Sequence, residues 1–178
     1  MNIQKSLLTA TLLTLGGFAA MTGANASGTQ ESTFKIETKI TSVCTIDASG
    51  AAITLTDIAA DTAALDTSIS NKTGGDIKVN CSKSTPYTIN LKTAGNLTST
   101  TGEGVMKGTG EKPDTITYKL FSDSTGTAVW GNTEDNAVKG TGTGLSTQFS
   151  HPVYASITGS TDVKQDTYTD TITATVTY

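Results

Sequence analysis

The sequence contains no arginine, one histidine and two cysteines among its 178 residues. Proteins that bind nucleic acid usually present a basic surface, and arginine is the side chain best shaped to bind phosphate. A chain with no arginine and a net charge of −4 does not have such a surface. A single histidine and two widely spaced cysteines also do not provide the ligand set of a metal site. We therefore predict no nucleic-acid partner, no metal and no cofactor.

Long helical patterns are also lacking. No segment keeps apolar residues at helical spacing for the ten or more residues that a helix prediction requires. The apolar residues instead occur in short alternating or β-branched runs, separated by turns rich in Gly, Thr, Ser, Asn and Asp. This pattern is typical of an antiparallel sandwich or barrel, and we predict an all-β fold.

The first 26 residues have the pattern of a secretory signal peptide. Lys5 precedes an apolar run, and Ala24-Asn25-Ala26 provides a small-x-small cleavage site. The apolar run is too short for a transmembrane anchor. We predict cleavage after Ala26, export from the cytoplasm, and no insertion of the remaining chain in the membrane.

The two cysteines, Cys44 and Cys81, would then enter an oxidising compartment, where such a pair most simply forms one disulfide. Closing a loop of this length is expected to stabilise the fold by roughly 4 kcal/mol. The expected role of this pair is structural.

The expected strands follow at short intervals, with two Gly/Thr-rich loops between them. We expect a helical turn at 61–70, and place the loops at 93–113, around Val105-Met106, and at 132–144. The strands are predicted at 51–58, 76–82, 86–91, 114–123, one within 146–159, and 168–178.

A search for catalytic residues finds no arrangement typical of an enzyme. His151 is the only residue that could serve as the base of a Ser/His/Asp triad, and it precedes Pro152 at the start of a strand, where a structural role is far more common. Glu134-Asp135 lacks the spacing of a calcium-binding loop. Trp130 could stack on a sugar, but we favour a position in the core. We predict that the protein is not an enzyme.

The functional interpretation of the chain depends on one alternating segment. From Phe34 onward, Phe34, Ile36, Thr38 and Ile40 alternate with Lys35, Glu37, Lys39 and Thr41. Alternate residues of a strand point to opposite faces, so the pattern predicts a strand with one face to bury and one charged face. The strand precedes the first cysteine, and it can pair either with its own domain or with a neighbouring molecule.

Taken together, these features resemble the spore coat protein U domain family, whose members include subunits of archaic, Csu-type chaperone–usher pili. The resemblance covers the predicted secreted chain and is most specific at Tyr168-x-Asp170-Thr171 and the residues that follow to Tyr178. Two positions, Ala155 and Asp166, stand where the family commonly has glycine. The remaining matching segments are 34–40, 43–46, 77–82, 87–91, 118–123 and 130–131.

The resemblance implies an incomplete immunoglobulin-like antiparallel β-sandwich (42–178) that lacks its last strand. The extension 27–41 would be a donor strand, with Phe34, Ile36, Thr38 and Ile40 entering a groove on the next subunit. Ile172, Ala174, Val176 and Tyr178 would form the edge of that groove and bind a periplasmic chaperone. Donor-strand exchange at an outer-membrane usher would then build a surface pilus for adhesion and biofilm formation.

The alternative that the residues leave open is a self-complete secreted β-sandwich, lectin-like or spore-coat-like, in which 34–40 is the domain's own first strand.

Overall fold

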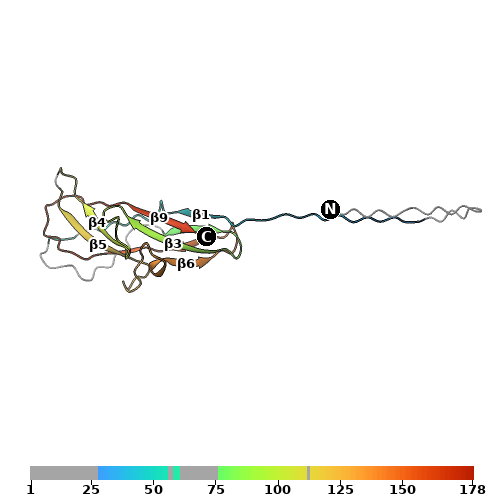
Figure 1. The fold of residues 1–178 in the computed structure, drawn as a ribbon. Helices are drawn as coiled ribbons and strands as arrows, with labels where there is room; N and C mark the ends of the chain where they lie inside the picture. Colours follow the sequence, from blue (N-terminus) through green and yellow to red (C-terminus); the bar gives the residue numbers. More distant parts are fainter. Residues whose placement is uncertain (1–27, 56–57, 61–75, 112) are drawn as a thin grey trace, which may run out of the picture. The chain divides into compact units, whose positions relative to one another are not determined.

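The computed structural model describes residues 28–55, 58–60, 76–111 and 113–178. Its elements are nine β-strands and one short 3₁₀ helix, so the predicted all-β class is confirmed (Figure 1). In chain order these are β1 (Cys44–Asp47), β2 (Ile77–Cys81), β3 (Pro86–Thr93), β4 (Glu103–Lys107), β5 (Thr115–Phe121), the 3₁₀ helix η1 (Glu134–Asn136), β6 (Val138–Thr141), β7 (Phe149–His151), β8 (Tyr154–Ile157) and β9 (Ile172–Thr177).

The strands described form three sheets, each of three strands, with every pairing antiparallel. The orders are β1-β2-β7, β6-β3-β9 and β4-β5-β8. The chain therefore crosses between sheets repeatedly, as expected for an immunoglobulin-like sandwich.

One apolar core lies between the sheets. Strand β2 contributes Ile77, Val79 and Cys81, and the alternating residues of β3 and β5 pack against them. Trp130 is fully buried at the centre and donates its Nε1–H to the carbonyl oxygen of Ile89 at 2.8 Å. The predicted core position of this tryptophan is therefore confirmed, and sugar stacking on its ring is excluded.

The predicted disulfide is present between Cys44 and Cys81. These residues are cross-strand partners at the first position of β1 and the last of β2. The bond therefore attaches a four-residue edge strand to the sheet at the point where the N-terminal segment leaves it.

Several strand boundaries differ from those predicted. No strand is assigned at 51–55, although Ala51 and Ile53 alternate, because these side chains pack on the core while the backbone makes no ladder. The loops predicted at 93–113 and 132–144 contain β4 and β6. The single strand predicted within 146–159 is two strands of different sheets, β7 and β8, which Pro152 and Val153 separate. The helical turn predicted at 61–70 lies outside the described residues.

The N-terminal part of the chain forms a separate unit. The molecule divides into Met1–Thr38 and Lys39–Tyr178, so the boundary falls within the predicted donor extension. No strand is assigned to the described residues 28–43. The predicted signal peptide, 1–26, lies outside the described part of the chain.

Candidate functional site

The candidate site lies between two strands that each have one free edge. Strand β1 pairs only with β2, and β9 pairs only with β3, among the strands that the structure describes. The two strands contact each other, but no ladder joins them (Figure 1). Unpaired edges of this kind leave backbone N–H and C=O groups available to an additional strand.

Two hollows lie beside the start of β9. The larger, about 710 Å³, is bordered by β5, β8 and residues 161–170. The smaller, about 320 Å³, is bordered by residues 48–53 and by side chains of β2, β3 and β9. Both hollows are lined by Ile53, Leu120, Asp170 and Ile172, so they join into one groove along the beginning of β9.

The apolar side chains that face this groove are incompletely covered. Ile172 is 39% exposed, and Ala174 is half-buried against the core. In a closed sandwich, inward-facing residues of this kind would be buried by a neighbouring strand. Among the residues that the structure describes, no strand covers this part of the groove.

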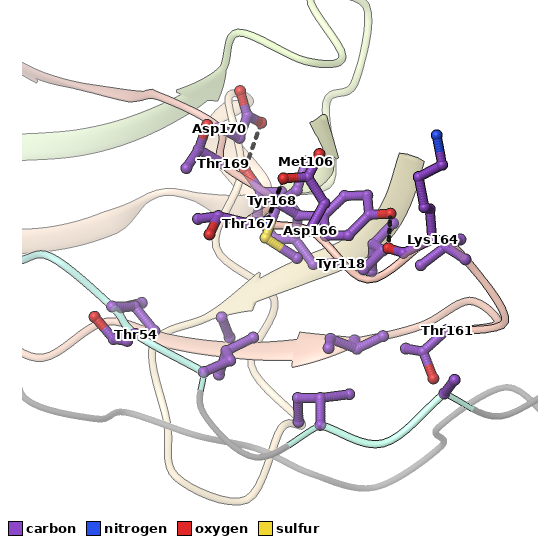
Figure 2. A pocket seen from close by; sticks show the side chains of 18 of the residues that line it. Thr54, Met106, Tyr118, Thr161, Lys164, Asp166, Thr167, Tyr168, Thr169 and Asp170 are labelled. Carbon is purple, nitrogen blue, oxygen red and sulfur yellow. Dashed lines mark hydrogen bonds between the residues drawn. The ribbon is translucent and has the colours of Figure 1, made fainter. Parts of the chain in front are cut away.

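The outer wall of the larger hollow is the segment 161–170 (Figure 2). Asp166 accepts hydrogen bonds from the backbone N–H and the hydroxyl of Thr109, both at 2.7 Å, and the hydroxyl contact is the main cause that lowers the pKa of its carboxyl group. Tyr168 donates its hydroxyl to the carbonyl oxygen of Lys164 at 2.6 Å. A backbone bridge from Lys107 to Thr169 fixes the end of the segment against β4.

A polar pair, formed by the buried Tyr118 and the half-buried Asp170, lies where the two hollows meet. The hydroxyl of Tyr118 donates to Oδ2 of Asp170 at 2.7 Å (Figure 2). Oδ1 of Asp170 accepts the backbone N–H groups of Gly95 at 2.8 Å and of Thr171 at 2.7 Å. Burial, reinforced by Asp170, raises the pKa of Tyr118, so the phenol remains a hydrogen-bond donor. The carboxylate thus connects the groove floor, the β3–β4 loop and the start of β9.

The predicted groove residues do not all lie at the same place. Ile172 and Ala174 line the smaller hollow, whereas Val176 and Tyr178 lie beyond both hollows, and Tyr178 is 57% exposed. The sequence analysis did not single out Asp170, Tyr118 or the segment 161–170. The only signal for them was the motif Tyr168-x-Asp170, which contributed to the resemblance but carried no assigned role.

The predicted donor residues are among the most exposed apolar side chains described. Phe34, Ile36 and Ile40 are each 85% exposed, and Thr38 is exposed as well. On the opposite face, Lys35 forms an ion pair with Glu37. Alternating large apolar side chains with no cover indicate a surface that another molecule buries.

Within the described ranges, no group of three or more His, Cys, Asp or Glu side chains could hold a metal ion. Across the same residues, no helix has the length and apolar character needed to cross a membrane. His151 lies at the end of β7, and its Nε2 is 3.0 Å from the hydroxyl of Tyr87.

A comparison with solved structures finds a likeness to a chain of the CsuC–CsuE chaperone–tip adhesion subunit pre-assembly complex from the archaic chaperone–usher Csu pili of Acinetobacter baumannii. The two chains are 20% identical, with a TM-score of 0.45. The match covers 78% of this chain and 40% of the other, so this protein spans less than half the length of that chain. No significant match is found among curated proteins.

The comparison with family profiles matches residues 30–175, which include the alternating extension, both cysteines, the groove and most of β9. This match extends over most of the 178 residues. The chain therefore belongs to the Spore Coat Protein U domain family.

Proposed function

We propose that this protein is a structural subunit of a bacterial surface pilus, assembled by the chaperone–usher route through donor-strand exchange. The extension 27–41 of one subunit completes the sandwich 42–178 of the next. The observation that carries the proposal is the complementarity within one chain between an uncovered apolar groove and an uncovered alternating apolar segment.

The free edge of β9 provides the backbone half of the interaction. An added strand would pair with the free edge of β9, whose inward residues Ile172 and Ala174 line the hollows. It would also cover an edge that promotes aggregation in an isolated domain. This is a physical reason for a chaperone to occupy the groove during transit through the periplasm and for the next subunit to occupy it in the fibre.

The inward face of the extension provides the apolar contacts of the interaction. Burying Phe34, Ile36 and Ile40 contributes about 5–8 kcal/mol, at roughly 1.5–3 kcal/mol for each side chain. The charged side chains of Lys35, Glu37 and Lys39 remain in solvent on the other face. A polymer held in this way needs no covalent bond between subunits and is suited to a surface fibre that supports adhesion and biofilm formation.

The remaining partners follow from the same mechanism. A periplasmic chaperone would engage Ile172, Ala174 and Val176 along β9, with the terminal carboxylate at Tyr178 available to a basic residue of the chaperone. An outer-membrane usher would then exchange the chaperone for the incoming extension. The protein would pass through the periplasm and end at the cell surface as a homopolymer or beside other pilus subunits.

The proposal is tested with two variants that each lack one half of the interaction. Ile36→Asp places a charge in the donor face, and Ala174→Arg places a long cation in the acceptor groove. Each variant expressed alone with its chaperone is expected to give no multimers. Mixing them is expected to give dimers only, because an intact donor is available to an intact groove in one direction.

Glu37→Asp, on the outer face of the extension, is the matched control and is expected to give multimers like the unmodified protein. Multimers are measured on an SDS gel without boiling. If Ile36→Asp polymerises as well as this control, the extension is not the donor, and a self-complete binding domain becomes the better account.

A further inference from the structure

Where its two hollows join, the groove has a charged group among apolar side chains. Of the four side chains that line both hollows, Ile53, Leu120 and Ile172 are apolar and Asp170 carries a carboxylate. Tyr118 lies beside it with its hydroxyl directed at the carboxylate (Figure 2). An incoming strand that crosses this junction must therefore cover a charged group that lies among apolar side chains.

The donor face has one polar position among its four inward residues. Phe34, Ile36 and Ile40 are large and apolar, and Thr38 has a hydroxyl group. Thr38 has apolar neighbours two residues away on either side along the strand. The polar position of the donor face thus matches the polar point at the junction of the groove, where apolar side chains surround Asp170.

The hydrogen-bond inventory of Asp170 allows a further donor. A carboxylate has about four lone-pair positions. The donors to it among the described residues are the Tyr118 hydroxyl and the N–H groups of Gly95 and Thr171. The hydroxyl oxygen of Tyr118, which gives its own hydrogen to Asp170, can also accept. Either atom can receive a hydrogen bond from a threonine hydroxyl.

We propose that Thr38 of one subunit is seated at the Asp170–Tyr118 pair of the next, and that this contact sets the register of the donor strand. The proposal rests on the proposed function and deepens it by assigning a specificity-determining pair. Ile36 and Ile40 then lie on either side of the pair, one in each hollow. The partner recognised is a second copy of this chain, or a subunit with the same polar position.

The register matters because a shift of the donor strand along the groove causes two unfavourable changes. A shift of two residues keeps the same face inward but places an isoleucine against the carboxylate and moves Thr38 away from the Asp170–Tyr118 pair. The first change covers the remaining acceptor position of the carboxylate with an apolar side chain, and the second separates the threonine hydroxyl from its acceptor. Both changes favour the register in which Thr38 meets Asp170.

The test uses the full-length protein, made with its chaperone and isolated as multimers. Thr38→Val is nearly isosteric and replaces the hydroxyl with a methyl group. Because the hydroxyl is a donor in this register, the variant multimers are expected to dissociate in denaturant on the order of tenfold faster. Thr38→Ser, which keeps the hydroxyl, is expected to dissociate at close to the unmodified rate.

Thr41→Val, on the outer face of the same extension, is the matched control and is expected to leave the dissociation rate unchanged. The sign of the Thr38→Val effect is decisive. An ordinary apolar pocket at this position would bind valine more tightly than threonine, so dissociation as slow as or slower than that of the unmodified multimers would overturn the proposal.

Cross-linking tests the register separately. Thr38→Cys combined with Asp170→Cys is expected to give dimers that resist boiling and are separated by a reductant. Facing residues of neighbouring strands lie within the distance that a disulfide can bridge. Preferential cross-linking of position 36 or 40 to position 170 would overturn the proposed register. In that case the formation of multimers would still support strand exchange. If the unmodified protein forms no multimers, it is the proposed function that fails.

Discussion

At the scale of single residues, the contact between His151 and Tyr87 links two sheets. His151 ends β7 of one sheet, and Tyr87 is a buried residue of β3 in another. Burial lowers the pKa of His151 below its usual value of 6.5, and the carboxylate of Asp76 opposes this only in part. Burial also raises the pKa of Tyr87. The neutral imidazole is therefore the partner of the tyrosine hydroxyl in the folded protein.

This contact predicts a pH dependence of stability. Since the folded pKa of His151 lies below the unfolded one, the unfolded chain binds more protons as the pH falls from about 7 towards 5. The free energy of unfolding is expected to decrease over that interval. His151→Gln is expected to show a smaller decrease, measured from urea unfolding curves of the assembled protein at several pH values. Equal pH slopes for both proteins would contradict the assignment.

Two tyrosines explain why the sequence analysis missed β4 and β6. The ring of Tyr118 covers its cross-strand partner Gly104 on β4, and the ring of Tyr87 covers its partner Gly140 on β6. A Cβ atom at either glycine would lie within 2.4 Å of the tyrosine ring. Glycine in a polar segment suggests a loop, but here it makes room for an aromatic side chain from the neighbouring strand. That pairing is visible only in three dimensions.

At the scale of elements, the disulfide attaches the edge strand β1 to its sheet. Strand β1 has four residues and one paired neighbour, β2. Its inward residues, Cys44 and Ile46, are only half-buried. The covalent bond from Cys44 to Cys81 thus holds an edge strand that has little packing of its own.

Replacing both cysteines tests this role. Cys44→Ser together with Cys81→Ser is expected to lower the free energy of unfolding by about 4 kcal/mol, because the reduced chain regains the entropy of an open loop. Trp130, the only tryptophan and fully buried, reports unfolding through its fluorescence. Reduction of the unmodified protein is the control and is expected to give a similar loss. A loss below about 1 kcal/mol would show that β1 is held mainly by packing.

The elements of the groove differ in how far the sequence could predict them. Strand β9 was predictable because Ile172, Ala174 and Val176 alternate with threonines over a long uninterrupted run. The wall formed by 161–170 was not, because it is an irregular segment held by side-chain contacts such as Asp166 with Thr109. The role of Asp170 likewise depends on Tyr118, which is 52 positions away in the sequence.

At the scale of the whole molecule, the chain contains both an apolar segment to be covered and an apolar groove to be filled. An isolated subunit in this state exposes Phe34, Ile36 and Ile40 at one place and the inward face of β9 at another. In the proposed function, combining the two surfaces between successive copies would satisfy both and would give an open chain of subunits, because donor and acceptor are different surfaces. Fibre growth would then be a consequence of the fold of the single subunit.

The most direct measurement is the size of the secreted protein on an SDS gel without boiling, beside a variant that lacks residues 27–40. We predict a ladder of multimers that collapses on heating and is absent from the deletion variant, which remains bound to its chaperone. A single monomer band with the extension present, together with loss of the fold when the extension is removed, would contradict strand exchange. The segment 34–40 would then be the domain's own first strand.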